Sequence, residues 1–232
     1  MSVKLVLFDL DGTLLDTAPD LGGALNSLRA EYNLNPLSHD MIRPVVSHGA
    51  PALLKLGLGI LPNDSRYASI RIRLLELYAA RLSRETKYFP GMEKLLRKLE
   101  RRKLAWGVVT NKPSHLTDPL LRDFDLYPRA ACVVSGDTTP RRKPYPDPLL
   151  YASDLCYIAP AECVYFGDAE RDVQAARAAG MAAVVALYGY IESSETPETW
   201  GADALLQKPL DLLDWLDRAP TTAQPHTEKV NA

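Results

Sequence analysis

Short apolar runs alternate with helical patterns along most of this chain, and this alternation limits its possible folds more than any other feature. The first run covers residues 3–8 and is broken only by Lys4, and similar runs cover residues 105–110 and 163–167. Continuous apolar strands of this length are typical of a parallel sheet that is buried on both faces. Between the runs, apolar residues follow the spacing of a helix, as in Met92, Leu95, Leu96 and Leu99. The sequence therefore predicts a doubly wound α/β fold.

The other elements of this Rossmann-like core have weaker patterns. Further strands are expected over residues 131–135, 182–186 and 204–207. Further helices are expected near residues 114–124, 147–156, 170–179 and 210–218. The two parts of the chain that carry the alternation, residues 1–17 and 88–218, are therefore expected to form one α/β core.

One long segment, residues 18–87, interrupts the alternation. It has no convincing strand, and its best helical pattern places five apolar side chains on one stripe, Tyr67, Ile70, Leu74, Leu77 and Tyr78. The chain returns to the core through a Pro-Gly breaker at residues 90–91. Ligands of open α/β sheets bind outside the carboxyl ends of the strands, and an insertion that leaves just after the first strand would cover that crevice. We therefore expect this segment to form a helical cap domain.

The charge balance and the cysteine pattern exclude several classes of protein. The chain carries 27 lysines and arginines against 29 aspartates and glutamates, a net charge of −2, so it has no bulk positive field to attract nucleic acid or anionic lipid. Its three cysteines form no C-x-x-C pair, and no segment resembles a signal peptide or a membrane span. We expect a cytoplasmic protein without nucleic-acid or membrane partners, and the sequence leaves its oligomeric state open.

The tail, residues 219–232, is polar, contains two prolines and shows no periodicity. Such a segment cannot bury enough apolar area to offset the entropy of ordering it. We expect it to be disordered.

Two carboxylates directly follow the first strand. Asp9 and Asp11 lie two positions apart, so they would point to the same side if the strand geometry continued. Two adjacent carboxylates repel each other unless a metal ion or a shared proton lies between them. Gly12 allows a sharp turn there, and an Asp-Gly turn without a chemical role is the ordinary explanation of such a sequence.

The ends of two later strands weaken that ordinary explanation. Thr110 and Asn111 offer a hydroxyl, an amide and backbone N–H groups, a donor set that binds phosphate oxygens, although capping of the next helix would also explain them. Asp168 ends the run at 163–167, and Asp172 lies four residues later. If the strands are neighbours, Asp168 lies near Asp9 and adds a hard oxygen ligand that suits Mg²⁺, whereas a helix N-cap is its alternative role.

Lys143 begins the segment K-P-Y-P-D-P, in which three alternating prolines stiffen the backbone. Most isolated lysines are solvated surface residues. A rigid base, however, favours delivery of this ammonium group to a specific anion.

Taken together and in order, these pieces resemble the haloacid dehalogenase (HAD) superfamily of phosphatases. Residues 9–16 resemble its first motif, residues 109–111 its second, Lys143 its third and residues 167–172 its fourth. The resemblance covers about residues 3–218, and four ordered motifs are specific where any one of them would be weak. It implies a Mg²⁺-dependent phosphate monoester hydrolase.

The resemblance also implies a role for each residue of the first and fourth motifs. Asp9 is expected to attack phosphorus and form an aspartyl phosphate, and Asp11 to act as general acid and base without binding the metal. Mg²⁺ is expected to be held by Asp9, Asp168 and the backbone carbonyl of Leu10. Haloacid dehalogenases lack an aspartate at the position of Asp11, so its presence here favours phosphoryl transfer.

The remaining motif residues are expected to bind the phosphoryl group. Thr110, the backbone N–H of Asn111 and Lys143 would hold its oxygens. Asp172 is expected to orient Lys143 or a metal-bound water.

Two rival classes of function fit the sequence less well. A dinucleotide-binding oxidoreductase would need a G-x-G-x-x-G segment after Phe8, and none is present. A catalytically silent binding module would be expected to have lost one of the motif residues, and Asp9, Asp11, Lys143 and Asp168 are all present.

Substrate recognition is expected from the cap. Residues 43–50 resemble the specificity loop of the phosphoglycolate phosphatase group, in which Arg43 would bind a second anionic group of the substrate beside His48 and Gly49. A solvated surface position would equally explain Arg43 and His48.

Other segments resemble a different branch of the same group, which dephosphorylates N-acetylmuramic acid 6-phosphate. These segments are residues 106–113, 188–191 and 200–203. Both this sugar phosphate and 2-phosphoglycolate are small phosphate monoesters that carry a carboxylate. The resemblance of these segments favours the sugar phosphate, and another sugar phosphate is the alternative.

Overall fold

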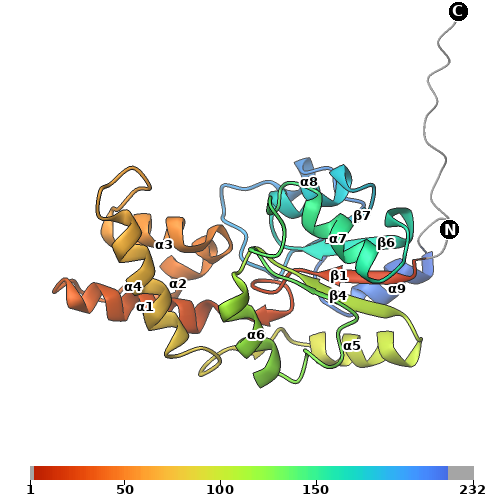
Figure 1. The fold of residues 1–232 in the computed structure, drawn as a ribbon, viewed down its shortest axis with the longest axis horizontal. Coiled ribbons are helices and arrows are strands. Elements are labelled where there is room, and N and C mark those ends of the chain that lie inside the picture. The colour runs from red at the N-terminus through yellow and green to blue at the C-terminus, as the bar shows by residue number, and fades with distance from the viewer. Residues whose placement is uncertain (1–2, 219–232) are drawn as a thin grey trace, which may run out of the picture.

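Six parallel strands form the central sheet, in the order β5-β4-β1-β6-β7-β8. The computed structural model describes residues 3–218, so the tail at 219–232 that was expected to be disordered lies outside the described residues. The strands are β1 (Leu5–Phe8), β4 (Ala105–Val109), β5 (Val133–Val134), β6 (Cys163–Gly167), β7 (Ala182–Ala186) and β8 (Ala204–Leu206). All six predicted strands are present, and the doubly wound α/β fold is confirmed (Figure 1).

Helices cover both faces of this sheet (Figure 1). They are α5 (Met92–Arg101), α6 (Ser114–Asp123), α7 (Asp147–Leu155), α8 (Glu170–Ala178) and α9 (Asp211–Arg218), with short 3-10 turns at Pro160–Glu162 and Pro197–Thr199. The apolar stripe predicted for α5 is fully buried. No helix within residues 3–218 is long and apolar enough to cross a membrane.

The central strand β1 is paired on both edges, with β4 on one side and β6 on the other. Its side chains alternate between the two faces of the sheet. Val6 and Phe8 join the core that α5, α6 and α9 cover, whereas Leu5 and Leu7 join the core under α7 and α8. All four side chains are fully buried, which explains why the first run is continuously apolar.

The segment between residues 18 and 79 contains helices and no strand. These are α1 (Ala18–Glu31), α2 (His39–Ile42), the 3-10 helix η1 (Arg43–His48), α3 (Gly49–Leu58) and α4 (Tyr67–Ala79). They lie beyond the carboxyl ends of the strands and form what we name the helical lobe (Figure 1). From the stripe predicted for α4, three side chains are buried, namely Ile70, Leu74 and Tyr78.

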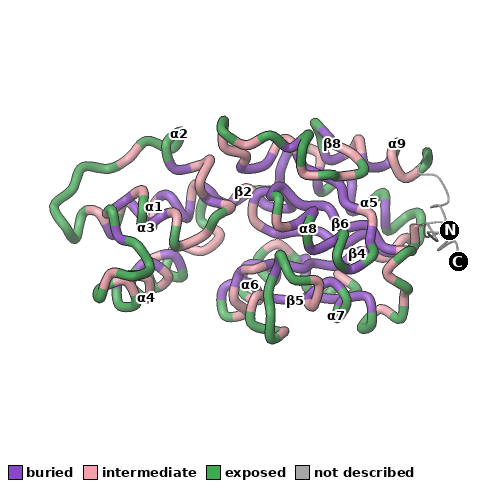
Figure 2. The backbone as a smooth tube through the Cα atoms, turned by 90° about the horizontal axis from the view of Figure 1, so that it is seen from above, coloured by how far each residue is buried: buried purple, intermediate pink, exposed green. Residues whose placement is uncertain are grey.

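Two short strands join the helical lobe to the core. β2 (Leu15–Asp16) and β3 (Lys87–Tyr88) pair antiparallel, with Asp16 opposite Lys87. The sequence patterns do not predict this pair, because two residues are too few to show alternation. Lys87, assigned above to the helical segment, therefore lies in a strand. The two crossings of the chain between core and lobe lie side by side at the neck of the molecule (Figure 2).

Candidate active site

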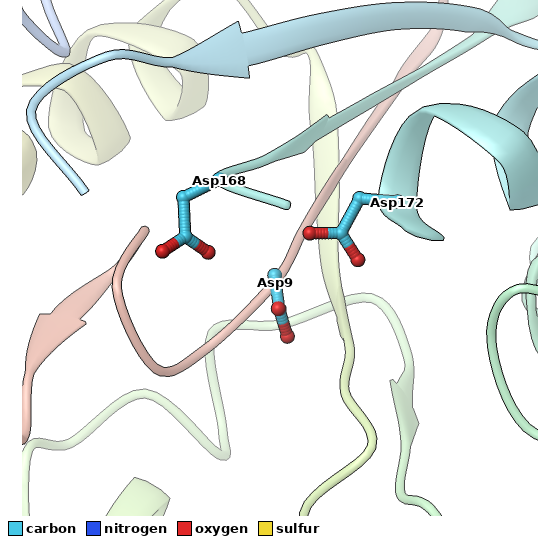
Figure 3. Close-up of side chains that lie close together, drawn as sticks. All are labelled: Asp9, Asp168 and Asp172. Atoms are coloured by element: carbon cyan, nitrogen blue, oxygen red, sulfur yellow. The ribbon is translucent and has the colours of Figure 1, made fainter. Parts of the chain in front are cut away.

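Three buried carboxylates meet where β1 and β6 end. Asp9 follows β1, Asp168 follows β6, and Asp172 lies in the first turn of α8. The two strands are neighbours, and the backbone N–H of Asp9 donates to the carbonyl of Phe166 at 2.9 Å. Figure 3 shows that the three side chains converge, and one oxygen of each lies within 4.8 Å of the others. Adjacent strand ends thus bring together residues that are far apart in the sequence.

Burial opposes ionisation of these carboxylates. It raises the pKa of Asp9 from 3.8 to about 6, although the charge of Lys143 lowers it. Burial, together with the charges of Asp9 and Asp172, raises the pKa of Asp168 from 3.8 to about 7. Among residues 3–218, only Lys143 forms an ion pair with the cluster. Three buried carboxylates that face one ammonium group fit a divalent cation, which prefers hard oxygen ligands.

The side chain of Lys143 is fully buried against the cluster. Its Nζ lies 3.1 Å from Oδ1 of Asp9 and 2.8 Å from Oδ1 of Asp172, and it donates to the hydroxyl of Tyr165 at 2.5 Å. The side-chain amide of Asn111 exchanges hydrogen bonds with the backbone N–H and carbonyl of Lys143, at 3.1 and 2.9 Å. These contacts hold both ends of the lysine and aim its charge at Asp9.

Asp11 contacts a second ammonium group, that of Lys112. Nζ of Lys112 donates to the two carboxylate oxygens of Asp11 at 2.8 and 3.1 Å, and to the hydroxyl of Tyr78 in α4 at 2.8 Å. The hydroxyl of Thr17 donates to the same carboxylate at 2.7 Å. The sequence patterns do not single out Lys112, although it lies two positions after Thr110 at the same strand end, which is the signal that would have found it.

The backbone carbonyl of Leu10 is engaged within its own turn. It accepts hydrogen bonds from the N–H groups of Leu14 at 3.0 Å and Leu15 at 2.9 Å, which use both of its lone pairs. The structure therefore does not support Leu10 as a metal ligand. The next carbonyl, that of Asp11, accepts no hydrogen bond from the described residues.

Asp168 is packed closely on several sides. Its Oδ2 accepts hydrogen bonds from the hydroxyl of Ser47 in η1 at 2.6 Å and from the N–H of Tyr190 at 2.8 Å. A Cβ added at Gly12 would lie 2.1 Å from Oδ2, and one added at Gly189 would lie 2.3 Å from the Cβ of Asp168. Ser47 is a second residue that sequence reasoning missed, because nothing local shows that the helical lobe reaches Asp168.

Arg43 lies outside the cavity at this site, contrary to the expectation that it binds substrate. Its guanidinium donates to the carbonyls of Gly189 at 3.0 Å and Tyr188 at 3.1 Å, and it lies over the ring of Tyr190. The cation is engaged in this way because η1 packs against the loop that follows β7. Arg43 therefore joins the helical lobe to the core.

A cavity of about 500 Å³ lies between the helical lobe and the core. Seven of the residues that the sequence indicated line it, namely Asp9, Asp11, His48, Gly49, Thr110, Asn111 and Lys143. The lining contains five lysines and arginines, which are Arg71, Lys112, Arg142, Lys143 and Arg171, but only two carboxylates, Asp9 and Asp11. Although the chain has a net charge of −2, this cavity is positively charged and suits an anionic ligand.

Known proteins are similar to this chain in sequence and in fold. Residues 6–186 match the family model of the haloacid dehalogenase-like hydrolases. A phosphoglycolate phosphatase of Xanthomonas campestris pv. campestris (strain 8004) is 43% identical over 209 residues, which cover 90% of this chain and 94% of that protein. An N-acetylmuramic acid 6-phosphate phosphatase of Pseudomonas putida is 36% identical over 219 residues, which cover 94% of this chain and 98% of that protein.

A solved structure shows the same likeness. It is the crystal structure of a protein of Haemophilus somnus 129pt described as a predicted phosphoglycolate phosphatase. The two structures agree with a TM-score of 0.81 at 26% identity, over 92% of this chain and 98% of that one.

The fold, the aspartates at the strand ends and these matches define the class: the chain belongs to the haloacid dehalogenase-like hydrolase family. Within that family it is a phosphatase, like the relatives that it matches over about nine-tenths of its length. The family assignment drawn from the four motifs is therefore confirmed.

Proposed function

We propose that this phosphatase uses Mg²⁺ to hydrolyse a small phosphate monoester that carries a carboxylate, and that Asp9 forms an aspartyl phosphate. The observation that carries the proposal is the convergence of Asp9, Asp168 and Asp172, two of which pair with Lys143, beside a positively charged cavity. Phosphate monoesters hydrolyse very slowly in water, so a site for them must supply a placed nucleophile and neutralise charge on the transferring group.

Asp9 is the proposed nucleophile. Its carboxylate attacks phosphorus, the bond from phosphorus to the ester oxygen breaks, and an acyl phosphate forms. Burial raises the pKa of Asp9 to about 6 even though the ammonium of Lys143 at 3.1 Å lowers it, so this ammonium favours the ionised form that the attack requires. The backbone N–H of Leu10 donates to Oδ1 of Asp9 at 2.8 Å and orients the carboxylate. Thr110, the N–H of Asn111 and Lys143 are the proposed donors to the phosphoryl oxygens.

Asp11 is the proposed general acid and base. In its protonated form it gives a proton to the leaving alkoxide. Its carboxylate then takes a proton from the water that cleaves the acyl phosphate, and inorganic phosphate leaves. Thr17 and Lys112 hold this side chain at the cavity wall, so it is placed for proton transfer while Asp9 bonds to phosphorus.

Asp9, Asp168 and the backbone carbonyl of Asp11 are the proposed ligands of Mg²⁺. A cation held there would offset the charge of the nucleophile and the phosphoryl group, so that two anions can approach each other. Asp172 is engaged with Lys143 at 2.8 Å, and its proposed part is to hold that ammonium group in place.

We also propose that residues 18–87 act as a cap domain over a catalytic core formed by residues 1–17 and 88–218. The helical lobe supplies one wall of the cavity through η1 and α4, and the strand ends of the core supply the other. Recognition of the substrate then lies on the cap and the chemistry on the core, with water excluded when the two are together.

Of the two candidate substrates, N-acetylmuramic acid 6-phosphate fits the cavity better than 2-phosphoglycolate. A cavity of about 500 Å³ lies in the range of roughly 300–1,000 Å³ that encloses a drug-sized ligand. A two-carbon phosphate would leave most of that space to water. The sugar phosphate has a ring, an acetyl group and a lactyl group to fill it, and Val46, Tyr67 and Leu75 offer apolar lining for them.

The test is phosphate release from a panel of monoesters, measured with Mg²⁺, with EDTA and with the Asp9→Asn variant. We expect turnover of the sugar phosphate with Mg²⁺, and loss of turnover in EDTA or in the variant, whose amide cannot form an acyl phosphate. Circular dichroism of the variant controls for folding.

Three results would contradict separate parts of the proposal. Retained activity of Asp9→Asn would remove the nucleophile, and full activity in EDTA would remove the metal. A kcat/KM for 2-phosphoglycolate about tenfold higher than for the sugar phosphate would reverse the substrate preference.

A further inference from the structure

We propose that Arg71 of α4 binds the carboxylate of the substrate, as a recognition subsite separate from the groups that bind the phosphate. This inference rests on the proposed function, and it deepens it by naming the residue that selects a doubly anionic substrate. The chemical class that the subsite would take is a carboxylate on the part of the substrate that is not transferred.

One face of α4 forms a wall of the cavity. Tyr67, Arg71, Leu75 and Tyr78 all line it, at spacings of four, four and three residues that place them on one side of the helix. α4 belongs to the helical lobe, whereas Asp9 and the phosphate-binding groups belong to the core. A ligand whose phosphate lies at Asp9 therefore meets this face of α4 with its other end.

Arg71 is a cation without a protein partner in this structure. Within residues 3–218, no carboxylate lies within 4.0 Å of it, and its side chain makes no hydrogen bond, although it is half-buried. Arg73 on the same helix is paired with Glu31 at 2.7 Å and with Glu76 at 3.0 Å. The donors of Arg71 are therefore available to a ligand in the cavity, whereas those of Arg73 are not.

The surroundings of Arg71 favour a strong and oriented contact. Tyr67 and Leu75 lie one turn away on either side of it and line the same cavity with apolar groups. A charge pair in such partly apolar surroundings is stronger than one in open solvent. The planar guanidinium can also form two parallel hydrogen bonds to one carboxylate, which fixes its orientation.

The other cations near the cavity are less suited to this role. Lys112 forms an ion pair with Asp11, and Lys143 forms one with Asp9. Arg43 donates hydrogen bonds to backbone carbonyls outside the cavity. Arg171 donates to the carbonyl of Ser47.

Arg142 is also without a side-chain partner among the described residues, but it is exposed at the rim of the cavity. Water and salt screen an exposed charge, so its contribution to binding would be small. Arg71 is therefore the half-buried cation that is left for a second anionic group.

The experiment compares two substrates that differ mainly in the carboxylate. N-acetylglucosamine 6-phosphate has the ring, acetyl group and phosphate of N-acetylmuramic acid 6-phosphate but lacks its lactyl group. In the Arg71→Gln variant we expect kcat/KM for the muramic acid substrate to fall by about 10- to 100-fold, the value of a charge-assisted hydrogen bond. For the glucosamine substrate we expect a change of less than about threefold, and Arg71→Lys should recover part of the loss.

Arg73→Gln is the matched control, because Arg73 lies on the same helix and is paired with acidic residues. We expect it to change kcat/KM for both substrates equally and little. Equal losses for both substrates in Arg71→Gln would overturn the proposal, since a carboxylate-specific contact cannot act on a substrate without one.

A binding measurement separates this inference from the proposed function. Calorimetric titration of the two substrates into Asp9→Asn, with and without Arg71→Gln, reports the subsite without turnover. We expect Arg71→Gln to weaken binding of the muramic acid substrate alone, and unchanged binding of both would overturn the subsite even if the enzyme is an active phosphatase. Full turnover by Asp9→Asn itself would overturn the proposed nucleophile, and the kcat/KM comparison of Arg71→Gln with the two substrates would then measure the subsite.

Discussion

Lys112 is the residue through which the helical lobe contacts the proposed proton-transfer group. Its ammonium touches Asp11 in the core and Tyr78 in α4, each at 2.8 Å. Burial raises the pKa of the Tyr78 hydroxyl well above its ordinary value of 10, so this hydroxyl stays neutral and accepts the hydrogen bond. Lys112 thereby holds Asp11 in place for as long as α4 lies against the core.

Replacing Lys112 by Met should impair proton transfer more than attack on phosphorus. We expect kcat for an alkyl phosphate to fall by about 10- to 100-fold, and for p-nitrophenyl phosphate by less than about threefold, because nitrophenolate leaves without a proton. Asp11→Asn should show the same selectivity with a loss of about 10² to 10⁴ for the alkyl ester.

Arg142→Met provides the control for this comparison, because Arg142 lines the cavity without contacting Asp11. It should affect both esters alike. Equal losses with both esters in Lys112→Met would show that Lys112 does not position the proton donor.

Two features of the structure require glycine at position 12, namely a positive φ and a lack of space for a Cβ, and substitutions can separate their effects. Its φ is +82°, and a Cβ there would lie 2.1 Å from Oδ2 of Asp168. Gly180 has a similar φ of +73° with nothing within 4 Å of an added Cβ. We expect Gly180→Ala to cost about 1 kcal/mol of stability with normal activity, whereas Gly12→Ala should also lose activity because Asp168 must move.

Thermal unfolding and initial rates check this pair of variants. Normal turnover by Gly12→Ala would mean that the position of Asp168 does not matter for the reaction.

Sequence reasoning located the residues at strand ends better than those brought in by packing. Asp9, Thr110 and Asp168 each directly follow a predictable strand, so the parallel sheet implies their convergence. Lys143 lies instead in the loop before α7, and its proline-rich segment rather than the sheet indicated it. Ser47 and Arg71 reach the site only because the helical lobe folds over the core, and no local pattern shows this. The expected position of Arg43 in the cavity differs from its observed position for the same reason, because the sequence does not show which cation of the lobe faces the cavity.

η1 and the loop after β7 form a junction between the helical lobe and the core. Arg43 donates to two carbonyls of this loop, and Nε2 of His48 lies 3.1 Å from Oε1 of Glu192 in the same loop. The loop is in turn held to the first motif, because the hydroxyl of Tyr190 donates to Asp16 at 2.7 Å. The contact between lobe and core is therefore connected through a few side chains to the geometry of the first motif, residues 9–16.

The Arg43→Gln variant tests this junction. We expect kcat/KM to fall by about three- to tenfold for substrates with and without a carboxylate alike, because two charge-assisted hydrogen bonds that dock the lobe are lost. Hydrogen exchange in residues 43–48 should also become faster, since that segment loses its contact with the core. A loss confined to the carboxylate-bearing substrate would return Arg43 to the role first expected from the sequence.

The elements themselves were predictable to the extent that they are long or buried. The strands β1, β4 and β6 and the helix α5 have clear apolar patterns because their apolar side chains are almost all buried, whereas β5 and β8 are shorter and have weaker patterns. The pair β2 and β3 was not predictable, because its two-residue strands are set by the way the lobe leaves and re-enters the core.

The carboxylate cluster couples the folding of the protein to pH. The pKa values of Asp9, about 6, and Asp168, about 7, lie above the ordinary 3.8. Between about pH 4 and pH 7 the folded protein therefore binds more protons than the unfolded chain, and its stability falls as pH rises. A cation that binds the ionised cluster should offset this loss, because it binds the folded state alone.

We expect the free energy of unfolding of the metal-free protein to fall between about pH 4 and pH 7, by at most about 1.4 kcal/mol per pH unit for each of the two groups. Urea titrations in EDTA and in Mg²⁺ measure this. Mg²⁺ should flatten the profile, and so should Asp168→Asn, which removes one titrating group without changing its shape. A flat profile for the native sequence in EDTA would contradict the raised pKa values.

The narrow neck of the molecule, formed by β2 and β3, allows the lobe to change in evolution independently of the core. Asp16 and Lys87 lie opposite each other in β2 and β3, so everything between them begins and ends at one point of the core. A longer, shorter or differently shaped insertion grafted at that point leaves the strand order and the strand ends untouched. If the lobe is the cap proposed above, new substrates can be acquired by exchange of the lobe, while the proposed reaction at the strand ends is inherited unchanged.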